Sequence, residues 1–299
     1  MIIRALRGLL VLAVLLTSNV SAEEGRLRPF LLADSAYESF DAAVEQTYDR
    51  LMDAGFLIVG NYRPVPGTEI VVFTSNELQA VATQTPLGGF GAVLRAAVTD
   101  VDGKIQVSYI NPHYMAAAYR LEGDIGPIAA TLEEYLGATE SFGSKKGLKE
   151  KSLASYRYLF GMERFDDTYA LGTFVNQSEA LATVAARLAD NDAGLSQVYR
   201  VRLPARQGVL FGVAMQPDGD ANKYYNDAYQ MSVVDVAELR GSAYLPYEVL
   251  VKDGEVQALH MRFRMAVHFP DLSMMGKHSF MTLMPSPDAI KDALETLAQ

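Results

Sequence analysis

Two stretches of the sequence decide the fold: residues 39–56 (SFDAAVEQTYDRLMDAGF) and residues 178–195 (SEALATVAARLADNDAGL). Each begins with a serine, which favours a helix start, carries apolar residues at helical spacing, and ends in Ala-Gly before another apolar residue. The two serines and the two glycines are each 139 positions apart, so the stretches align without a gap. This alignment predicts two equivalent helices and therefore an internal repeat.

The segments after these helices continue the repeat. Two strand-like runs follow in each half, and then a hairpin turned at Asp102-Gly103 in the first half and at Asp253-Gly254 in the second. The hairpin strands are predicted at residues 92–101 and 105–110, and again at residues 244–251 and 256–268. The two turns are 151 positions apart, which predicts about twelve additional residues near positions 217–231. Closing helices are predicted at residues 125–136 and 287–298.

This order of elements predicts an α+β fold made of two similar units, each a mostly antiparallel sheet with helices packed on one face. The first unit is expected at residues 29–140 and the second at residues 169–299. Residues 141–168 begin with the polar, lysine-rich run SFGSKKGLKEKS, which favours a solvated linker. Residues 1–22 are interpreted as a signal peptide.

The N-terminus has the three parts of a secretory signal. Arg4 and Arg7 precede an apolar run, and Val20 and Ala22 occupy the positions that a signal peptidase reads. We expect cleavage after Ala22 and a soluble periplasmic protein. The apolar run is too short to span a membrane, and the chain lacks the cysteine that a lipoprotein anchor needs, so no membrane anchor is expected.

Composition excludes several classes of function. The 299 residues include no Cys and no Trp, so disulfides, thiolate metal sites and thiol catalysis are absent. The 36 Asp and Glu residues outnumber the 26 Lys and Arg residues, which argues against nucleic-acid binding. The chain has neither a phosphate-binding glycine motif nor a nucleophile-elbow serine, so no catalytic residue is predicted and a non-enzyme is favoured.

Residues 244–256 (YLPYEVLVKDGEV) resemble the Leu-Pro, strand, acidic-Gly turn and strand signature of the family catalogued as domain of unknown function 302. Residues 107–112 (VSYINP) are similar to the strand-ending Tyr-x-x-Pro element of that family. The first half has Leu94-Arg95 where Leu-Pro would stand, and the second half has His268-Phe269-Pro270 at its strand end. The resemblance implies a duplicated small α+β sheet fold and brings no established activity.

The inserted segment is the first candidate site. Asp218, Asp220 and Asn222 alternate like calcium ligands, but Lys223 replaces the glycine of such a loop and a tyrosine replaces its bidentate glutamate. A polar surface loop is therefore expected in preference to a calcium site. Tyrosine gives rigid amphipathic contact area, so three tyrosines here are candidate ligand-binding residues: Tyr224, Tyr225 and Tyr229.

The second candidate site is rich in histidine and methionine. Residues 260–284 hold three of the four histidines and six of the twelve methionines, a set that suits Cu(I) in an exported protein. On the strand expected at residues 256–268, Met261 and Met265 point to one face and are predicted to be core. Four residues around the following turn remain as metal ligands: His268, Met274, Met275 and His278. The alternative is a methionine-filled apolar patch.

The sequence thus predicts a periplasmic binding or accessory protein without catalytic machinery, whose partner is a small molecule or another protein. No cofactor other than copper is suggested. One alternative is a Cu(I)-binding protein that uses the His/Met turn, and another is an enzyme with its site between the two units. The sequence leaves homo-oligomerisation open.

Overall fold

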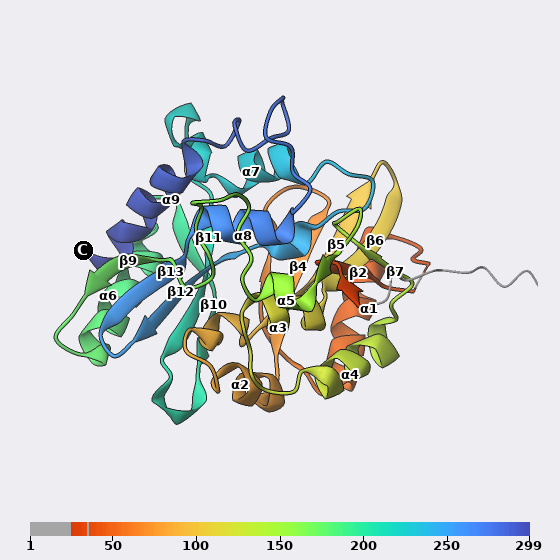
Figure 1. Cartoon of the computed structure of the whole chain (residues 1–299), viewed down its shortest axis with the longest axis horizontal. Coiled ribbons are helices and arrows are strands. Elements are labelled where there is room, and N and C mark those ends of the chain that lie inside the picture. Colours follow the sequence, from red (N-terminus) through yellow and green to blue (C-terminus); the bar gives the residue numbers. More distant parts are fainter. Residues whose placement is uncertain (1–24, 35) are drawn as a thin grey trace, which may run out of the picture.

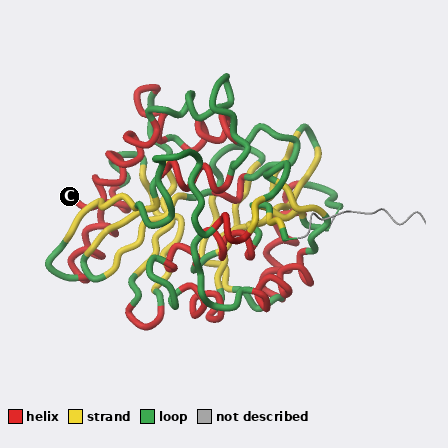
Figure 2. Tube along the Cα trace, in the orientation of Figure 1, coloured by secondary structure: helices red, strands yellow, loops and turns green. Residues whose placement is uncertain are grey.

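The computed structural model describes residues 25–34 and 36–299, so the predicted signal peptide and the predicted cleavage point lie outside the described residues. The fold is α+β, as predicted, with two antiparallel sheets and flanking helices (Figures 1 and 2). The first half of the chain forms the right side of Figure 1 and the second half the left. The first sheet has the strand order β3 (Leu57–Tyr62), β4 (Thr68–Thr74), β5 (Leu94–Val101), β6 (Lys104–Ile110), β2 (Phe30–Leu32) and β7 (Glu140–Phe142).

The second sheet has the same strand order, without a counterpart of β7. Its strands are β10 (Leu195–Arg202), β11 (Val209–Met215), β12 (Tyr247–Lys252), β13 (Glu255–Leu259) and β9 (Thr168–Thr173). A separate short ladder joins β1 (Arg26–Leu27) to β8 (Leu148–Lys149). The common order confirms the predicted repeat, because a chance similarity between two helices would not impose one strand order on both sheets.

The two equivalent helices are α1 (Phe40–Asp53) and α6 (Gln177–Asp190). The Ser39 side chain caps α1 by accepting a hydrogen bond from the Ala42 N–H, as predicted. In the second half the expected cap, Ser178, is wrong: Asn176 caps α6 by accepting from the Glu179 N–H. Asparagine is as good an N-cap as serine, so the helix begins earlier and takes Ser178 into its first turn.

Three further pairs of helices occur in equivalent places. They are α2 (Asn76–Ala82) with α7 (Asp227–Val234), α3 (Pro112–Ala118) with α8 (Met261–His268), and α4 (Gly126–Leu136) with α9 (Ser286–Glu295); the short α5 (Glu150–Leu153) lies between the two units and has no counterpart among the described residues. Only Ser75 separates β4 from α2, whereas residues 216–226 separate β11 from α7. This confirms the predicted insertion, although residues 227–231 of the predicted range belong to α7.

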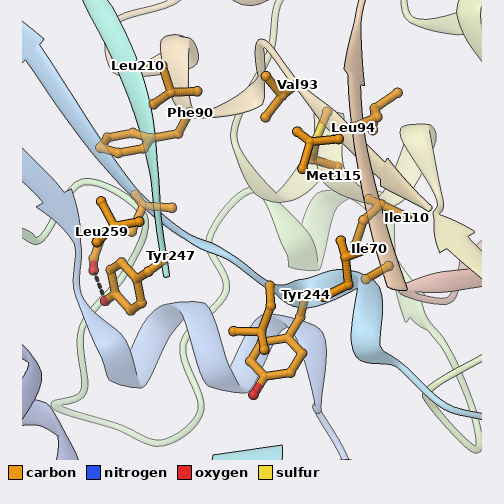
Figure 3. Packing of buried hydrophobic residues seen from close by; sticks show 14 of the residues in the cluster. Ile70, Phe90, Val93, Leu94, Ile110, Met115, Leu210, Tyr244, Tyr247 and Leu259 are labelled. Atoms are coloured by element: carbon orange, nitrogen blue, oxygen red, sulfur yellow. Dashed lines mark hydrogen bonds between the residues drawn. The ribbon is translucent and has the colours of Figure 1, made fainter. Parts of the chain in front are cut away.

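The two sheets meet at their edge strands, β3 and β10. Both strands have a bulge at the equivalent place, between Ile58 and Gly60 and between Gln197 and Tyr199. A Cβ atom on Gly60 would lie 2.5 Å from the Val198 carbonyl oxygen, so only glycine allows this approach. One continuous cluster of buried apolar residues also spans both halves, as Figure 3 shows for Ile70 beside Tyr244. The halves therefore share one core.

The strand predicted at residues 256–268 is wrong beyond Leu259. The His260 side chain accepts a hydrogen bond from the Arg262 N–H and starts α8 instead. Most of α8 is buried on all sides, which hides the helical period and leaves an alternation that imitates a strand. The prediction that Met261 and Met265 belong to the core is confirmed, because both are buried.

Met261→Ala is expected to lower the free energy of unfolding by about 2–3 kcal/mol, since truncation of a buried methionine opens a cavity. The value lies low in the usual range because Met265, one helical turn away, is flexible enough to fill part of the void. Urea denaturation measures the loss, with Met281→Ala at an exposed position as the control. Equal stability of the two variants would contradict the assignment of Met261 to the core.

Residues 141–168 do not form a free, solvated linker. Phe142 pairs with Phe30 as part of β7, and Leu153 is fully buried. Phe165 is buried too, and its ring stacks on Tyr119 with the centroids 5.1 Å apart. The lysines of this segment are exposed, as its composition predicted, but its apolar residues anchor it to the body of the protein.

Candidate functional site

A buried charged centre joins the two halves. Arg95, on β5 of the first sheet, forms an ion pair with Glu248, on β12 of the second. Arg264 of α8 approaches the other oxygen of the same carboxylate, with 3.0 Å between Nε and Oε2. Arg95 and Glu248 are each 1% exposed, so the charges are removed from solvent and interact strongly.

Backbone carbonyls complete the coordination of the guanidinium groups. Arg95 Nε donates to the Ala243 carbonyl at 2.8 Å, and Arg264 donates to the carbonyls of Tyr244 and Pro246. These carbonyls belong to the segment that enters β12, where the strand ladder has not yet begun. Burial lowers the pKa of Arg264, but the Glu248 carboxylate together with Tyr247 and Tyr119 raises it, and the pKa lies above its usual range.

Tyrosine rings enclose this charged centre. Arg264 lies over the rings of Tyr247 and Tyr244, at 4.5 and 5.6 Å from their centroids. Burial raises the pKa of Tyr119 to about 12, and the hydroxyls of Tyr119, Tyr199 and Tyr244 have no hydrogen-bond partner among the described residues. Ordered water is the ordinary partner of such buried hydroxyls.

Asp227 makes a second polar link between the halves. It stands at the start of α7, and its Oδ2 accepts hydrogen bonds from the Tyr62 hydroxyl at 2.8 Å and from the Met215 N–H at 2.9 Å. Tyr62 belongs to β3 of the first sheet. Burial raises the pKa of Asp227 to about 7, although these two hydrogen bonds and Arg264 act in the opposite direction.

His268, at the end of α8, adjoins this centre. Its Nδ1 lies 2.7 Å from the Arg264 carbonyl oxygen, and its ring lies beside Phe30 and Tyr244. Burial and the two guanidinium groups, Arg264 and Arg95, hold the pKa of His268 well below its usual range, so the ring is neutral. The chemistry available in this region is therefore charge pairing inside the protein and proton uptake by Asp227.

The three tyrosines predicted to bind a ligand lie in two environments. Tyr224 and Tyr229 meet edge to face, 5.8 Å between ring centroids, and Lys223 Nζ lies over both rings at 5.2 and 5.6 Å. The Tyr225 hydroxyl instead donates to the Ala193 carbonyl at 3.2 Å. The structure thus brings two of the three together, around a lysine of their own segment.

The predicted calcium-like loop folds as a 3-10 turn, Asp220–Tyr225. Asn222 uses its side-chain amide to donate to the Asp218 carbonyl at 3.1 Å, which is an ordinary contact within a loop.

The four residues predicted as soft-metal ligands also differ in their surroundings. His268 is buried, Met274 packs partly against the core, and Met275 is largely exposed. His278 Nδ1 lies 3.2 Å from the Val233 carbonyl oxygen. In residues 25–34 and 36–299, no group of three or more His, Asp or Glu side chains is placed to hold a metal ion. Cu(I) binding stays a prediction from composition.

Sequence reasoning missed Arg95, Glu248 and Arg264. A signal for the first two existed: each is a charged residue inside an otherwise apolar run, LRAAV and YEVLV. Charged residues are seldom buried without a partner, so an arginine in one buried strand and a glutamate in another indicate a pair. The residue that each would meet could not be read from the sequence.

A shallow cleft of about 250 Å³ lies between the halves. Leu87 of the first half and Leu250, Lys252 and Gln257 of the second contribute to its lining.

Comparison with protein-family models gives no match, and comparisons with curated proteins and with solved structures give none either. The resemblance to the family of domain of unknown function 302 therefore stays a prediction that rests on its motif residues. None of the helices within the described part of the chain is long and apolar enough to cross a membrane.

Proposed function

We propose that this chain is an exported binding or accessory protein that acts through its surface and not by catalysis. One observation carries the proposal: an exposed group of large apolar side chains, here called the Met-Phe face. It consists of Leu159, Phe160, Met275, Met281 and Met284. Phe160 is 93% exposed, Met275 79% and Met284 62%. Apolar side chains exposed together on a protein mark interaction sites.

Contacts beneath the Met-Phe face hold its two segments together. The Tyr158 ring lies against Phe280, with 4.1 Å between centroids, and the Tyr158 hydroxyl donates to the Leu272 carbonyl at 2.7 Å. Phe160 therefore leaves the body of the protein next to the loop that carries the exposed methionines. Methionine side chains adapt to the shape of a partner, which suits them to a contact surface.

The charged centre supports the non-catalytic part of the proposal. Glu248 is occupied by two guanidinium groups, which also bind backbone carbonyls, and all three side chains are buried. Because these three side chains bind one another and the backbone, they join the two halves and leave little for a substrate to engage.

The N-terminal motif supports export. The intact mass of protein recovered from the periplasm is expected to match a chain that begins at Glu23.

A triple variant tests the surface role. Phe160→Ser, Met281→Ser and Met284→Ser together are expected to move the exported protein from the particulate fraction of lysed cells to the supernatant. Val175→Ser is the matched control, since Val175 is also 93% exposed but lies in the turn between β9 and α6. The proposal fails if both variants fractionate like the wild type, provided that their urea midpoints show them to be folded.

A further inference from the structure

We propose that the Met-Phe face binds an anionic lipid surface, with its apolar side chains in the headgroup region and a neighbouring lysine segment against the lipid phosphates. This inference rests on the proposed function and names its partner. The binding is peripheral, because residues that dip into the bilayer interface need no spanning helix.

The lysine segment, residues 145–160, has a net positive charge, whereas the whole chain has a net negative charge. It contains five basic residues and one acidic residue, Glu150, in a protein whose acidic residues exceed its basic residues by ten. Its basic residues are Lys145, Lys146, Lys149, Lys151 and Arg157. The four lysines are all exposed, so their charge faces solvent.

Direct contacts place this segment beside the Met-Phe face. The Lys145 N–H donates to Asp271 Oδ2 at 2.5 Å, which fixes the start of the segment to the loop that carries Met275. At its other end the segment runs into the face, because Leu159 and Phe160 belong to both, and the Arg157 guanidinium lies 4.9 Å from the centre of the Phe160 ring. Between them the chain crosses α8 (Figure 1), where the Tyr156 hydroxyl donates to the Ala266 carbonyl at 3.1 Å.

Acidic residues close to the segment are largely engaged inside the protein. Glu163 pairs with Arg262 at 2.8 Å, and Asp166 pairs with Arg120 at 2.7 Å. Asp271 accepts the backbone N–H of Lys145 and keeps its charge, so Asp271 and Glu150 offset two of the five basic residues and leave an excess of three positive charges. The field near the Met-Phe face is therefore positive, which selects a negatively charged partner.

The composition of the face favours lipid over an acidic protein. Its most exposed side chains, Phe160 and Met275, are large and apolar and lie in two loops, which suits insertion between headgroups. Cationic side chains around such residues add electrostatic attraction to anionic lipids, and each lysine near the surface strengthens binding about fivefold.

Vesicle binding tests the inference with the full mature chain. The wild type is expected to sediment with vesicles of phosphatidylcholine and phosphatidylglycerol but not with phosphatidylcholine alone, and added salt should release it. Replacement of the four lysines by glutamine should weaken binding by at least about tenfold, and so should Phe160→Ser. Lys104→Gln, at an exposed lysine elsewhere, and Val175→Ser are controls that should bind like the wild type.

Because the chain has no native cysteine, a dye on one introduced cysteine can report whether that position inserts into the vesicle membrane. A polarity-sensitive dye on Leu159→Cys should shift to the blue with anionic vesicles, and the same dye on Val175→Cys should not. Equal binding to neutral and anionic vesicles, or no binding, would overturn the lipid assignment. If the protein does not bind vesicles but the triple serine variant still changes fractionation, the partner is a protein and the proposed function stands. If neither assay shows a difference, the lipid assignment and the proposed function both fail.

Discussion

Glu248→Gln is expected to lower the free energy of unfolding by about 3–5 kcal/mol, the usual cost of removing one partner from a buried ion pair. The reason is specific to the charged centre: glutamine leaves the guanidinium groups of Arg95 and Arg264 buried without a counter-charge. Because these residues lie on both sides of the junction, the loss should appear in a single cooperative transition. Urea denaturation followed by circular dichroism measures it.

Glu238→Gln is the matched control for this variant. Glu238 pairs with Lys104 at 3.4 Å, and both side chains are exposed, so its loss should cost less than about 1 kcal/mol. If Glu248→Gln also lowers the free energy of unfolding by less than about 1 kcal/mol, solvent or a structural change must stabilise the charges of the two buried arginines in place of Glu248. A further variant separates charge from packing: replacing Arg95, Glu248 and Arg264 together by apolar residues should recover most of the stability.

Asp227→Asn is expected to flatten the pH dependence of stability. Burial raises the pKa of Asp227 from 3.8 to about 7, so the folded protein keeps a proton that the unfolded chain releases. Stability therefore falls as pH rises from about 4 to about 7, by about 4 kcal/mol in total, and stays low above that range. Asparagine cannot ionise, so the variant lacks this penalty.

The comparison of variant and wild type should change with pH. Near pH 8 the variant avoids the penalty of about 4 kcal/mol, but its one unpaired amide donor costs about 1–3 kcal/mol. The variant is therefore expected to be the more stable protein, by the difference between these two free energies. Near pH 5 the cost of the amide donor alone remains, and the variant should be the less stable. Asp235 is buried with a raised pKa too, but it is present in both proteins and cancels.

Urea midpoints at several pH values measure this difference, and Asp218→Asn on the exposed part of the same segment serves as the control. Parallel pH profiles for wild type and Asp227→Asn would show that Asp227 is ionised in the folded protein throughout.

The sequence was sufficient to predict the repeat, the fold class and the insertion, because local patterns carry each of them. Ser39 and the Asp-Gly turns act through contacts a few residues away, and two such patterns at a fixed spacing reveal the duplication. The strand predicted through His268 failed for a physical reason. A helix buried on nearly all sides has no polar face, so its period cannot be distinguished from that of a strand.

The charged centre was not predictable because its partners are distant in sequence. Arg95 and Glu248 are 153 positions apart, and no local spacing relates them. Arg95 departs from the Leu-Pro element of the resembling family, but that departure does not indicate a partner. Tyrosine and histidine suggest binding or metal ligation by their residue type, whereas the buried centre consists of residue types that are common on any surface.

The matching bulges at the β3 and β10 edges bear on the origin of this chain. Two copies of one small domain that paired edge to edge as a homodimer, and later became fused, would leave this symmetric contact. The charged centre shares this symmetry in position but not in charge. Counted across the ladders from the two bulges, by way of Val72 in one sheet and Gly212 in the other, Arg95 and Glu248 stand at equivalent positions. Two identical copies would place the same residue at both positions, and like charges there would repel. An arginine facing a glutamate therefore requires two halves of different sequence, which a single fused chain supplies.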